Sequence, residues 1–378
     1  MNLSSQKIFA FKLYRFAYDK VSSIIDWVLY QLRFPVKGIS KLPESGEKII
    51  VYTGGGVVPR ISRIAKWIKK DGQYYTVLLD YKLNHFRQFS NTEWDAIFIF
   101  RNTYHLKRIV GKLPEVYLYH AYAPKSKYPD VVRRIVKRPF IIDMQDVYSN
   151  YYGSNPSIKW IKKELILEKQ CLLKSDGVVG ASLEPNVALR KYGKDIPPTI
   201  YFPLCCDNDS FMDNQKTLHP ENIHIVYAGG VAGSHRDSAH YGTIQFFHLI
   251  QILEGQRIHF HIYPSPSNHS TDTEEYKKIS ASNKYFHFHE PVAQDMLAEE
   301  INKYHFGLIP FFKKDTQISV EKMKYATSLK MFNYIEAGIP VIVSEELTYQ
   351  SWLANRYDVG YAVKAVDINA LKSIVILK

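Results

Sequence analysis

Short apolar runs alternate with amphipathic stretches along the first half of the chain. The runs of strand length are residues 48–53, 74–79, 96–100, 116–119, 140–142 and 177–181. Between them, residues 59–70 and 158–173 have the apolar spacing of helices. Apolar runs without strict alternation, separated by helices, are typical of a parallel sheet covered on both faces. Residues 41–203 are therefore predicted to form one doubly wound α/β domain.

The same pattern begins again after a polar, aperiodic segment, residues 204–221, which is predicted to be a linker. Strands are predicted at residues 223–228, 258–263, 306–311, 340–344 and 359–363, and helices at 241–253, 294–304 and 329–337. Residues 222–378 are thus predicted to form a second domain with the architecture of the first. Ligands of such domains bind at the carboxyl ends of the strands, so we expect the site in a cleft between two facing domains.

The N-terminal segment, residues 1–40, contains one predicted amphipathic helix at residues 8–33. Its apolar positions are Leu13, Phe16, Ala17, Val21, Ile24, Ile25 and Val28, and its polar positions are Lys12, Arg15, Asp19, Ser22, Ser23 and Asp26. One interpretation is a helix packed across the first domain. The other is a helix in peripheral contact with an anionic membrane, which the aromatic and basic residues favour and Asp19 and Asp26 oppose.

The composition is that of a soluble globular protein: 378 residues, 46% hydrophobic and 23% charged, enough for two domains. No apolar run approaches the roughly 20 residues that span a bilayer, and the N-terminus lacks the pattern of a signal peptide. Three cysteines give neither a disulfide framework nor zinc spacing. We therefore expect a cytoplasmic protein.

The formal net charge of +12 favours an anionic partner: a phosphate-bearing ligand, an acidic lipid or a nucleic acid. Lysine and arginine are scattered, without an arginine-rich tract or a nucleic-acid-binding module. Nucleic acid is therefore not an expected partner.

One segment near the end of the second domain, residues 328–341 (SLKMFNYIEAGIPV), joins a loop, a helix, a tight glycine turn and a buried strand. The N-terminus of such a helix offers free N–H groups and the positive end of its dipole, and Lys330 adds a full charge. A pyrophosphate would be well held there. The alternative is that Lys330 is an ordinary solvated lysine.

This segment resembles the donor-binding motif of retaining GT-B glycosyltransferases that assemble bacterial surface polysaccharides, Ser/Pro-x-Lys-x-x-Glu/Asp-Tyr-x-x-x-Gly-x-Pro-Val. The resemblance implies an α/β GT-B fold and a nucleotide-diphosphate sugar as donor. It also implies that Lys330 contacts the pyrophosphate and that Asn333 stands where an acidic residue holds the ribose. Asn333 is a neutral, weaker acceptor, and Glu336, about one turn further on, is a candidate substitute.

Other segments are similar to this family in their order and spacing. The resemblance implies donor contacts for Gly55 and Gly56 in the first glycine loop, Gly229 and Gly230 after the strand at 223–228, Arg236, and His289 beside the nucleotide base. Glycine at such turns lets the backbone approach a phosphate closely.

Two residues of the first domain are catalytic candidates. The resemblance places His120, at the end of the strand that begins at residue 116, beside the donor sugar. From the residues alone, a histidine after an apolar strand is more often a structural residue. Asp146 follows the next strand, where a carboxylate faces the cleft, and we expect it to contact the acceptor hydroxyl or to act as general base.

Taken together, the sequence predicts a hexosyltransferase that moves a sugar to a glycan or lipid-linked acceptor. We interpret Asp207-Asn208-Asp209 as a solvated linker and expect neither a metal nor a cofactor beyond the donor. One alternative is a catalytically degenerate protein that binds a nucleotide or a partner. Another is a nucleotide-sugar epimerase, which His287 and His289 favour slightly. Members of the family usually continue into a further C-terminal helix, so we expect the chain to be short there.

Overall fold

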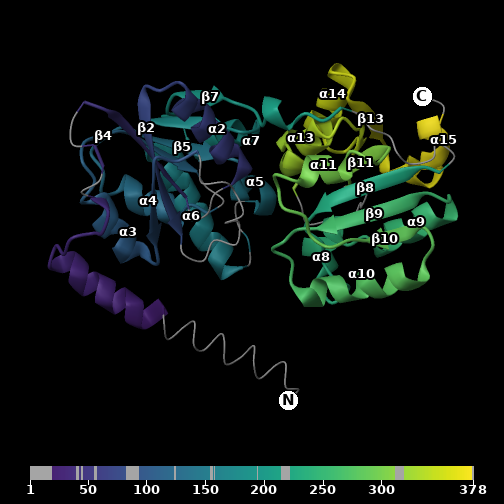
Figure 1. Cartoon of the computed structure of the whole chain (residues 1–378), viewed down its shortest axis with the longest axis horizontal. Helices are drawn as coiled ribbons and strands as arrows, with labels where there is room; N and C mark the ends of the chain where they lie inside the picture. Colours follow the sequence, from purple (N-terminus) through teal and green to yellow (C-terminus); the bar gives the residue numbers. More distant parts are fainter. Residues whose placement is uncertain are drawn as a thin grey trace, which may run out of the picture. The chain divides into compact units, whose positions relative to one another are not determined.

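The computed structural model describes residues 19–39, 42–43, 46–54, 58–81, 93–122, 125–153, 156, 158–193, 195–213, 222–310 and 319–376. Contacts divide the chain into two compact units, each built around one of the sheets in Figure 1. The first unit comprises Met1–Gln145, Ile158–Val179 and Tyr192–Ile200, and the second comprises Asp146–Ser157, Gly180–Lys191 and Tyr201–Lys378. Two short segments that follow strands of the first sheet therefore belong to the second unit.

The first sheet has seven strands in the described residues, in the order β3-β2-β1-β4-β5-β6-β7. They are β1 (Lys48–Thr53), β2 (Tyr74–Tyr81), β3 (Ala96–Phe100), β4 (Val116–Tyr122), β5 (Phe140–Met144), β6 (Gly177–Gly180) and β7 (Thr199–Tyr201). The helices are α2 (Pro59–Lys70), α3 (Thr103–Val110), α4 (Lys127–Arg133) and α6 (Lys159–Lys174). β1 pairs in parallel with both β2 and β4, so the strand order changes direction there.

The apolar stripe of α2 covers one face of this sheet. Ile61 and Ala65 are completely buried and pack in a cluster with Ile50 and Leu78 of the neighbouring strands. Burial of such a stripe is the main stabilisation of a helix of this length.

Residues 19–31 form a further helix of the first unit, drawn in purple in Figure 1. It buries Ser22 and Asp26 and exposes Val21, Ile24 and Ile25. The helix thus packs on the domain through its polar side. Residues 8–18 of the predicted helix lie outside the described residues.

The second sheet has six strands in the described residues, in the order β10-β9-β8-β11-β12-β13. They are β8 (His224–Gly229), β9 (His259–Pro264), β10 (Phe286–Phe288), β11 (Phe306–Ile309), β12 (Val341–Ser344) and β13 (Gly360–Val363). One face is covered by α9 (Phe247–Gly255), α10 (Ser270–Ser282) and α15 (Leu371–Ile376). The other is covered by α11 (Leu297–Ile301), α13 (Leu329–Glu336) and α14 (Thr348–Arg356).

The second unit also contains α5 (Tyr148–Tyr152), α7 (Glu184–Tyr192) and α12 (Val320–Tyr325), and α5 contacts α12. Shorter elements are η2 (Asn208–Ser210), α8 (Ser238–Tyr241), η3 (Gly242–Ile244) and η4 (Ala365–Ala370). No helix among the described residues has both the length and the apolar composition needed to cross a bilayer.

The predicted pair of parallel sheets with flanking helices is confirmed, while some boundaries were wrong. The predicted helix at 241–253 is broken, because Gln245 has an extended backbone after the 3-10 turn at Gly242–Ile244, and α9 begins only at Phe247. The Gln245 side-chain amide donates to the carbonyls of Gly233 and Arg236. The strand predicted at 306–311 ends at Ile309, since Pro310 cannot donate a ladder hydrogen bond. The predicted solvated linker is also wrong at Asp207, which is 8% exposed.

Candidate functional site

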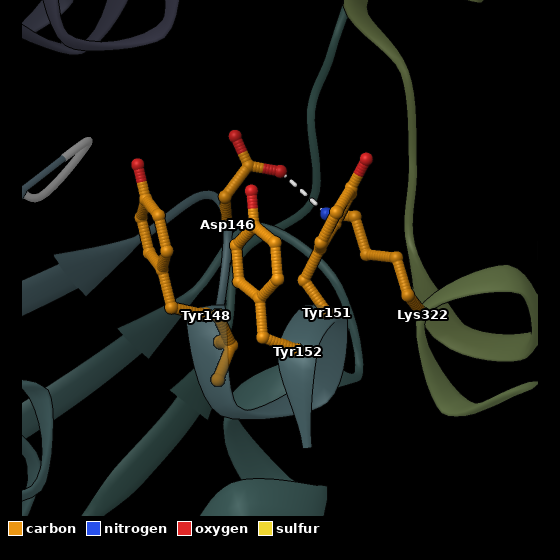
Figure 2. A pocket seen from close by; sticks show the side chains of 6 residues that line it. Asp146, Tyr148, Tyr151, Tyr152 and Lys322 are labelled. Atoms are coloured by element: carbon orange, nitrogen blue, oxygen red, sulfur yellow. Dashed lines mark hydrogen bonds and ion pairs between the residues drawn. The ribbon is translucent and has the colours of Figure 1, made fainter. Parts of the chain in front are cut away.

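A cavity of about 160 Å³ lies at the start of α5 in the second unit. Its lining residues are Asp146, Val147, Tyr148, Tyr151, Tyr152 and Lys322. The tyrosines stand at positions i, i+3 and i+4 of one short helix, a spacing that puts side chains on the same face. Figure 2 shows the three rings rising from α5 with their hydroxyls at the same end as the Asp146 carboxylate. We call this space the tyrosine cavity.

Lys322 of α12 joins two carboxylates at this cavity. Its Nζ lies 2.5 Å from Asp146 Oδ1 and 3.1 Å from Glu184 Oε2 (Figure 2 shows the Asp146 contact). The Glu184 side chain is 1% exposed and that of Lys322 is 13% exposed, whereas that of Asp146 is 59% exposed. Asp146 is therefore the carboxylate of the three-residue cluster that a ligand reaches.

The charges of Lys322, Asp146 and Glu184 shift one another's pKa values. Coulombic attraction to Lys322 lowers the pKa of Asp146 below its usual value. Burial raises the pKa of Glu184 to about 7, against the opposing effect of Lys322. Burial disfavours the charge of Lys322, yet Asp146 and Glu184 together raise the pKa of that ammonium. At neutral pH Asp146 is ionised and is able to accept a proton or a hydroxyl hydrogen bond.

Lys330 stands in the first turn of α13, where the Ser328 side chain accepts a hydrogen bond from the Lys330 backbone N–H. Its Nζ lies 5.5 Å from the ring centroid of Tyr227, and its stem passes close to Gly229 at the end of β8. Burial lowers the pKa of Lys330, and Asp146 opposes that effect. The structure therefore brings Lys330, Gly229 and Asp146, all predicted site residues, into one neighbourhood.

A second cavity, of about 470 Å³, opens at the carboxyl ends of β8 and β9. It is lined by Gly230, Val231, Ala232, Arg236, Tyr241, Ile244, Ser265, Ser267, Asn268, His269 and Asp272. We call it the strand-end cavity. Its volume lies in the range of small-molecule sites, and its position is where α/β sheets bind ligands.

Arg236 lines the strand-end cavity but is held by a carboxylate of the protein. Its Nε and Nη2 each lie 2.8 Å from Asp272, and this hydrogen bonding raises the pKa of Arg236. The Asp272 carboxylate therefore offsets much of the charge that Arg236 would offer to a phosphate. Gly230, in contrast, has open space where a Cβ would be.

His120 lies within β4 rather than at its end, because the strand continues to Tyr122. It is 5% exposed, and its Nε2 lies 3.4 Å from Asp143 Oδ2. Asp143 also accepts hydrogen bonds from Arg60 Nε at 3.0 and 3.1 Å. The structure therefore places His120 in a buried polar network of the first unit.

His289, Asn333 and Glu336 line neither cavity. The His289 ring stacks on Tyr263 at 4.2 Å, and its Nε2 lies 3.0 Å from His261 Nδ1. Asn333 and Glu336 are both buried: Asn333 accepts a hydrogen bond from Gln294, and Glu336 accepts one from the backbone of Asp207. Gly55 and Gly56 lie outside the described residues.

The sequence reasoning missed Lys322, Glu184 and the tyrosines of α5. Glu184 had a usable signal, because it follows β6 as Asp146 follows β5, and these strands are neighbours in the sheet. Parallel neighbours bring the residues after their carboxyl ends together. Lys322 has no such signal, since it lies between elements that the apolar pattern identified.

Residues 241–374 match the family model of the C-terminal domain of glucosyltransferase 3-like proteins. No curated protein sequence matches the chain. Among solved structures, sucrose-phosphate synthase from Thermosynechococcus elongatus is similar with a TM-score of 0.61 and 13% identity, over 87% of this chain and 89% of that one.

Two further structures have a similar fold. The E. coli trehalose-6-phosphate protein bound with UDP-2-fluoro glucose has a TM-score of 0.56 and 9% identity, over 85% of this chain and 90% of that one. The S. aureus MnaA structure with UDP has a TM-score of 0.52 and 12% identity, over 88% of each chain. At these identities the likeness shows the fold alone, and the predicted α/β GT-B fold is confirmed.

Proposed function

We propose that the chain is a glycosyltransferase that moves a hexosyl group from a nucleotide-diphosphate sugar to a hydroxyl of an acceptor. The observation that carries the proposal is the position of Lys330 at the start of α13, against Gly229 and within the field of the ionised Asp146. A cation for the donor phosphates and a carboxylate for the acceptor hydroxyl are the two charges that this transfer needs. The glucosyltransferase 3-like match over residues 241–374 supports it.

The donor, in this proposal, lies at the carboxyl end of β8. Its pyrophosphate contacts Lys330 and the N-terminal amides of α13, and its nucleoside occupies the strand-end cavity beside Gly230. Lys330 then stabilises the departing nucleotide diphosphate, so no metal is required. Two structures of similar fold hold UDP or a UDP-sugar, which makes UDP-sugars the first donors to test.

The acceptor, in this proposal, places one sugar ring in the tyrosine cavity, whose 160 Å³ suits a single ring. The acceptor oxygen attacks the anomeric carbon, the bond to the phosphate oxygen breaks with its electron pair, and the acceptor proton goes to Asp146. We propose a glycan or lipid-linked acceptor in surface polysaccharide or glycoconjugate assembly, at the inner face of the plasma membrane. Attack assisted directly by Asp146 inverts the anomeric configuration, whereas the motif implies retention, and NMR of the product distinguishes the two outcomes.

A thermal-shift screen with UDP-, GDP-, ADP- and CMP-sugars tests the donor site. A ligand at about 100 times its Kd raises stability by about 2.7 kcal/mol, a readily measured shift. We expect a shift with one nucleotide that Lys330→Ala abolishes. The matched control, Lys324→Ala, removes an exposed lysine of α12 and should keep the shift. Absence of a shift with all four donors would contradict the proposal.

One observation favours a second candidate, a degenerate protein that binds a nucleotide without turnover. Asn333 and Glu336, which the motif assigns to the ribose, are both engaged by other parts of the protein. Slow hydrolysis of the donor without acceptor would exclude this candidate. The epimerase alternative gains no support, because His287 and His289 bond His259 and His261 and line neither cavity.

A further inference from the structure

The helix at residues 19–31 directs a continuous apolar stripe outward. The exposed fractions are 57% for Val21, 63% for Ile24, 49% for Ile25, 39% for Val28 and 63% for Leu32. These positions follow i, i+3, i+4, i+7 and i+11, the spacing of one helix face. Trp27 and Phe34 add two aromatic side chains that are 46% and 50% exposed. Helices of globular domains normally turn such a stripe toward the core, so this orientation needs an explanation.

The orientation is fixed by a buried carboxylate on the opposite side. Asp26 is completely buried and accepts hydrogen bonds from Arg101 Nε and Nη2 at 2.6 and 2.7 Å and from Asn102 at 2.7 Å. Arg108 Nη1 lies 3.8 Å away. Rolling the helix to bury its apolar stripe would pull Asp26 out of this ion-pair network. The polar side therefore anchors the helix, and the apolar side is left for another surface.

Three lysines of the same unit, Lys125, Lys127 and Lys163, are exposed. Burial lowers the pKa of Lys127, the charges of Lys163 and Lys125 act in the same direction, and the charge of Asp19 at the start of the helix opposes them. Lys125 Nζ lies 5.9 Å from the ring centroid of Trp160, which is 49% exposed. Lys20 precedes Ile24 by one turn of the helix. The unit that carries the apolar stripe therefore also exposes ammonium groups and a further indole.

We infer that this surface, residues 19–34 together with Lys125, Lys127, Trp160 and Lys163, docks on an anionic lipid bilayer. The apolar side chains enter the interface and the lysines contact lipid phosphates, the arrangement of an interfacial helix. The carboxylate of Asp26, which an anionic surface would repel, is turned inward and neutralised. A second copy of the chain fits less well as the occupant, because pairing two such surfaces would bring their lysine groups together.

Co-sedimentation of the full chain with phosphatidylcholine vesicles, with and without an equal part of phosphatidylglycerol, tests the inference. We expect binding to the anionic vesicles alone, weakened by salt. Ile24→Asn/Ile25→Asn should reduce vesicle affinity by about tenfold or more, because the free energy gained by moving two isoleucine side chains from water into the membrane interface is lost. The matched control, Val366→Asn, changes a 60% exposed residue of η4 in the second unit and should bind as the wild type does.

The melting temperature of each variant is measured first, so that loss of folding is distinguished from loss of docking. Equal binding to neutral vesicles would contradict the role of the lysines. The inference would be overturned if the chain does not bind vesicles and light scattering shows a dimer instead. If Ile24→Asn/Ile25→Asn dissociates that dimer, the surface is assigned to a second copy of the chain. No donor or acceptor is present in these assays, so their outcome is independent of the proposed transferase activity.

Discussion

The Cβ that Gly229 lacks would lie 2.4 Å from Cε of Lys330 and 3.2 Å from its Nζ. The lysine therefore occupies the space that any other residue at position 229 would fill. This is the close approach for which glycine is needed at the end of β8. The glycine turn after β8 therefore helps to determine where the ammonium group of Lys330 lies.

Gly229→Ala is expected to displace Lys330, to weaken donor binding and to lower stability, because Gly229 has φ +156°, a backbone conformation that alanine rarely adopts. The Cβ would meet the flexible end of the Lys330 side chain, which moves away, and its contact with the donor is then lost. Charge-assisted contacts contribute about 1.5–3 kcal/mol, so we expect the donor Kd, measured by calorimetry, to rise by about tenfold or more. Gly255→Ala is the control, since its Cβ would meet nothing within 4 Å. An unchanged Kd would show that Lys330 does not contact the donor.

Tyr152 is expected to act on the acceptor and not on the donor. Its ring stands between those of Tyr148, 5.9 Å away, and Tyr151, 4.5 Å away. Tyr152→Ala removes the middle of this aromatic wall, and we expect the acceptor KM to rise by about tenfold with the donor Kd unchanged. Tyr152→Phe keeps the ring and should retain most of the affinity. If the alanine variant lowers donor affinity instead, the tyrosine cavity belongs to the donor.

Two ion pairs of the first unit should differ sharply in their contribution to stability. In the Arg60–Asp143 pair the side chains are 3% and 1% exposed, so Asp143→Asn removes a carboxylate charge that lies against a buried guanidinium. We expect a loss of about 3–5 kcal/mol in urea unfolding. In the Arg138–Glu115 pair the side chains are 52% and 74% exposed, and Glu115→Gln should cost less than about 1 kcal/mol. Similar losses in the two variants would contradict the buried network around His120.

Five of the six described strands of the second unit were predictable, because each is a short apolar run at a position where a parallel sheet is buried on both faces; β10, with His287 between two phenylalanines, was not predicted. The run ending at Gly229 and the helix that begins after Ser328 are examples. The contact between Gly229 and Lys330 was not predicted. Asp146 was proposed as a site residue because it follows the carboxyl end of a strand.

The remaining site residues depended on information that local pattern does not contain. The spacing around His120 does not reveal that it lies beside Asp143, 23 residues away, or that Asp143 also bonds Arg60, 83 residues away. The amphipathic pattern at residues 19–31 was correct, but its direction depended on Arg101 across the tertiary structure. Spacing identifies the two faces of a helix, while a distant partner decides which face is buried.

A column of histidines on one face of the second sheet should make the protein sensitive to acid. Its members are His224, His259, His261, His287 and His289, whose ring nitrogens lie 2.9–3.0 Å apart in three pairs. Burial lowers the pKa of His224 to about 4 and that of His289 to about 4, and lowers the pKa of His261 strongly.

Because an unfolded histidine titrates near pH 6.5, the unfolded chain binds more protons than the folded chain between about pH 6.5 and pH 4. Stability contributed by this column is therefore lost as the pH falls through that window. We expect His224→Gln to lose stability less steeply than the wild type in urea unfolding between these pH values. His248→Gln, at an exposed position of α9, should follow the wild-type curve. Parallel curves for all three proteins would contradict the prediction.

Glu184 should produce the opposite dependence on pH. Burial raises the pKa of its carboxyl group to about 7 in the folded chain, from about 4.5 in the unfolded one. Between these values the folded chain binds more protons, so its stability falls as the pH rises and is constant outside the window. Glu184→Gln removes this titration but leaves Asp146 as a partner of Lys322. The stability of the variant relative to the wild type should therefore increase, by on the order of 3 kcal/mol, from about pH 4.5 to pH 7.

Urea unfolding of the two proteins at unit steps of pH measures this difference directly, because the slope from the histidine column is common to both and cancels. Glu290→Gln, whose side chain is 79% exposed, is the control and should leave the difference flat. A flat difference for Glu184→Gln as well would mean that Lys322 holds the Glu184 carboxylate ionised throughout. Lys322 would then be shared by two charged carboxylates, and the negative charge of Glu184 would raise the pKa of Asp146 and make it a stronger base for the acceptor.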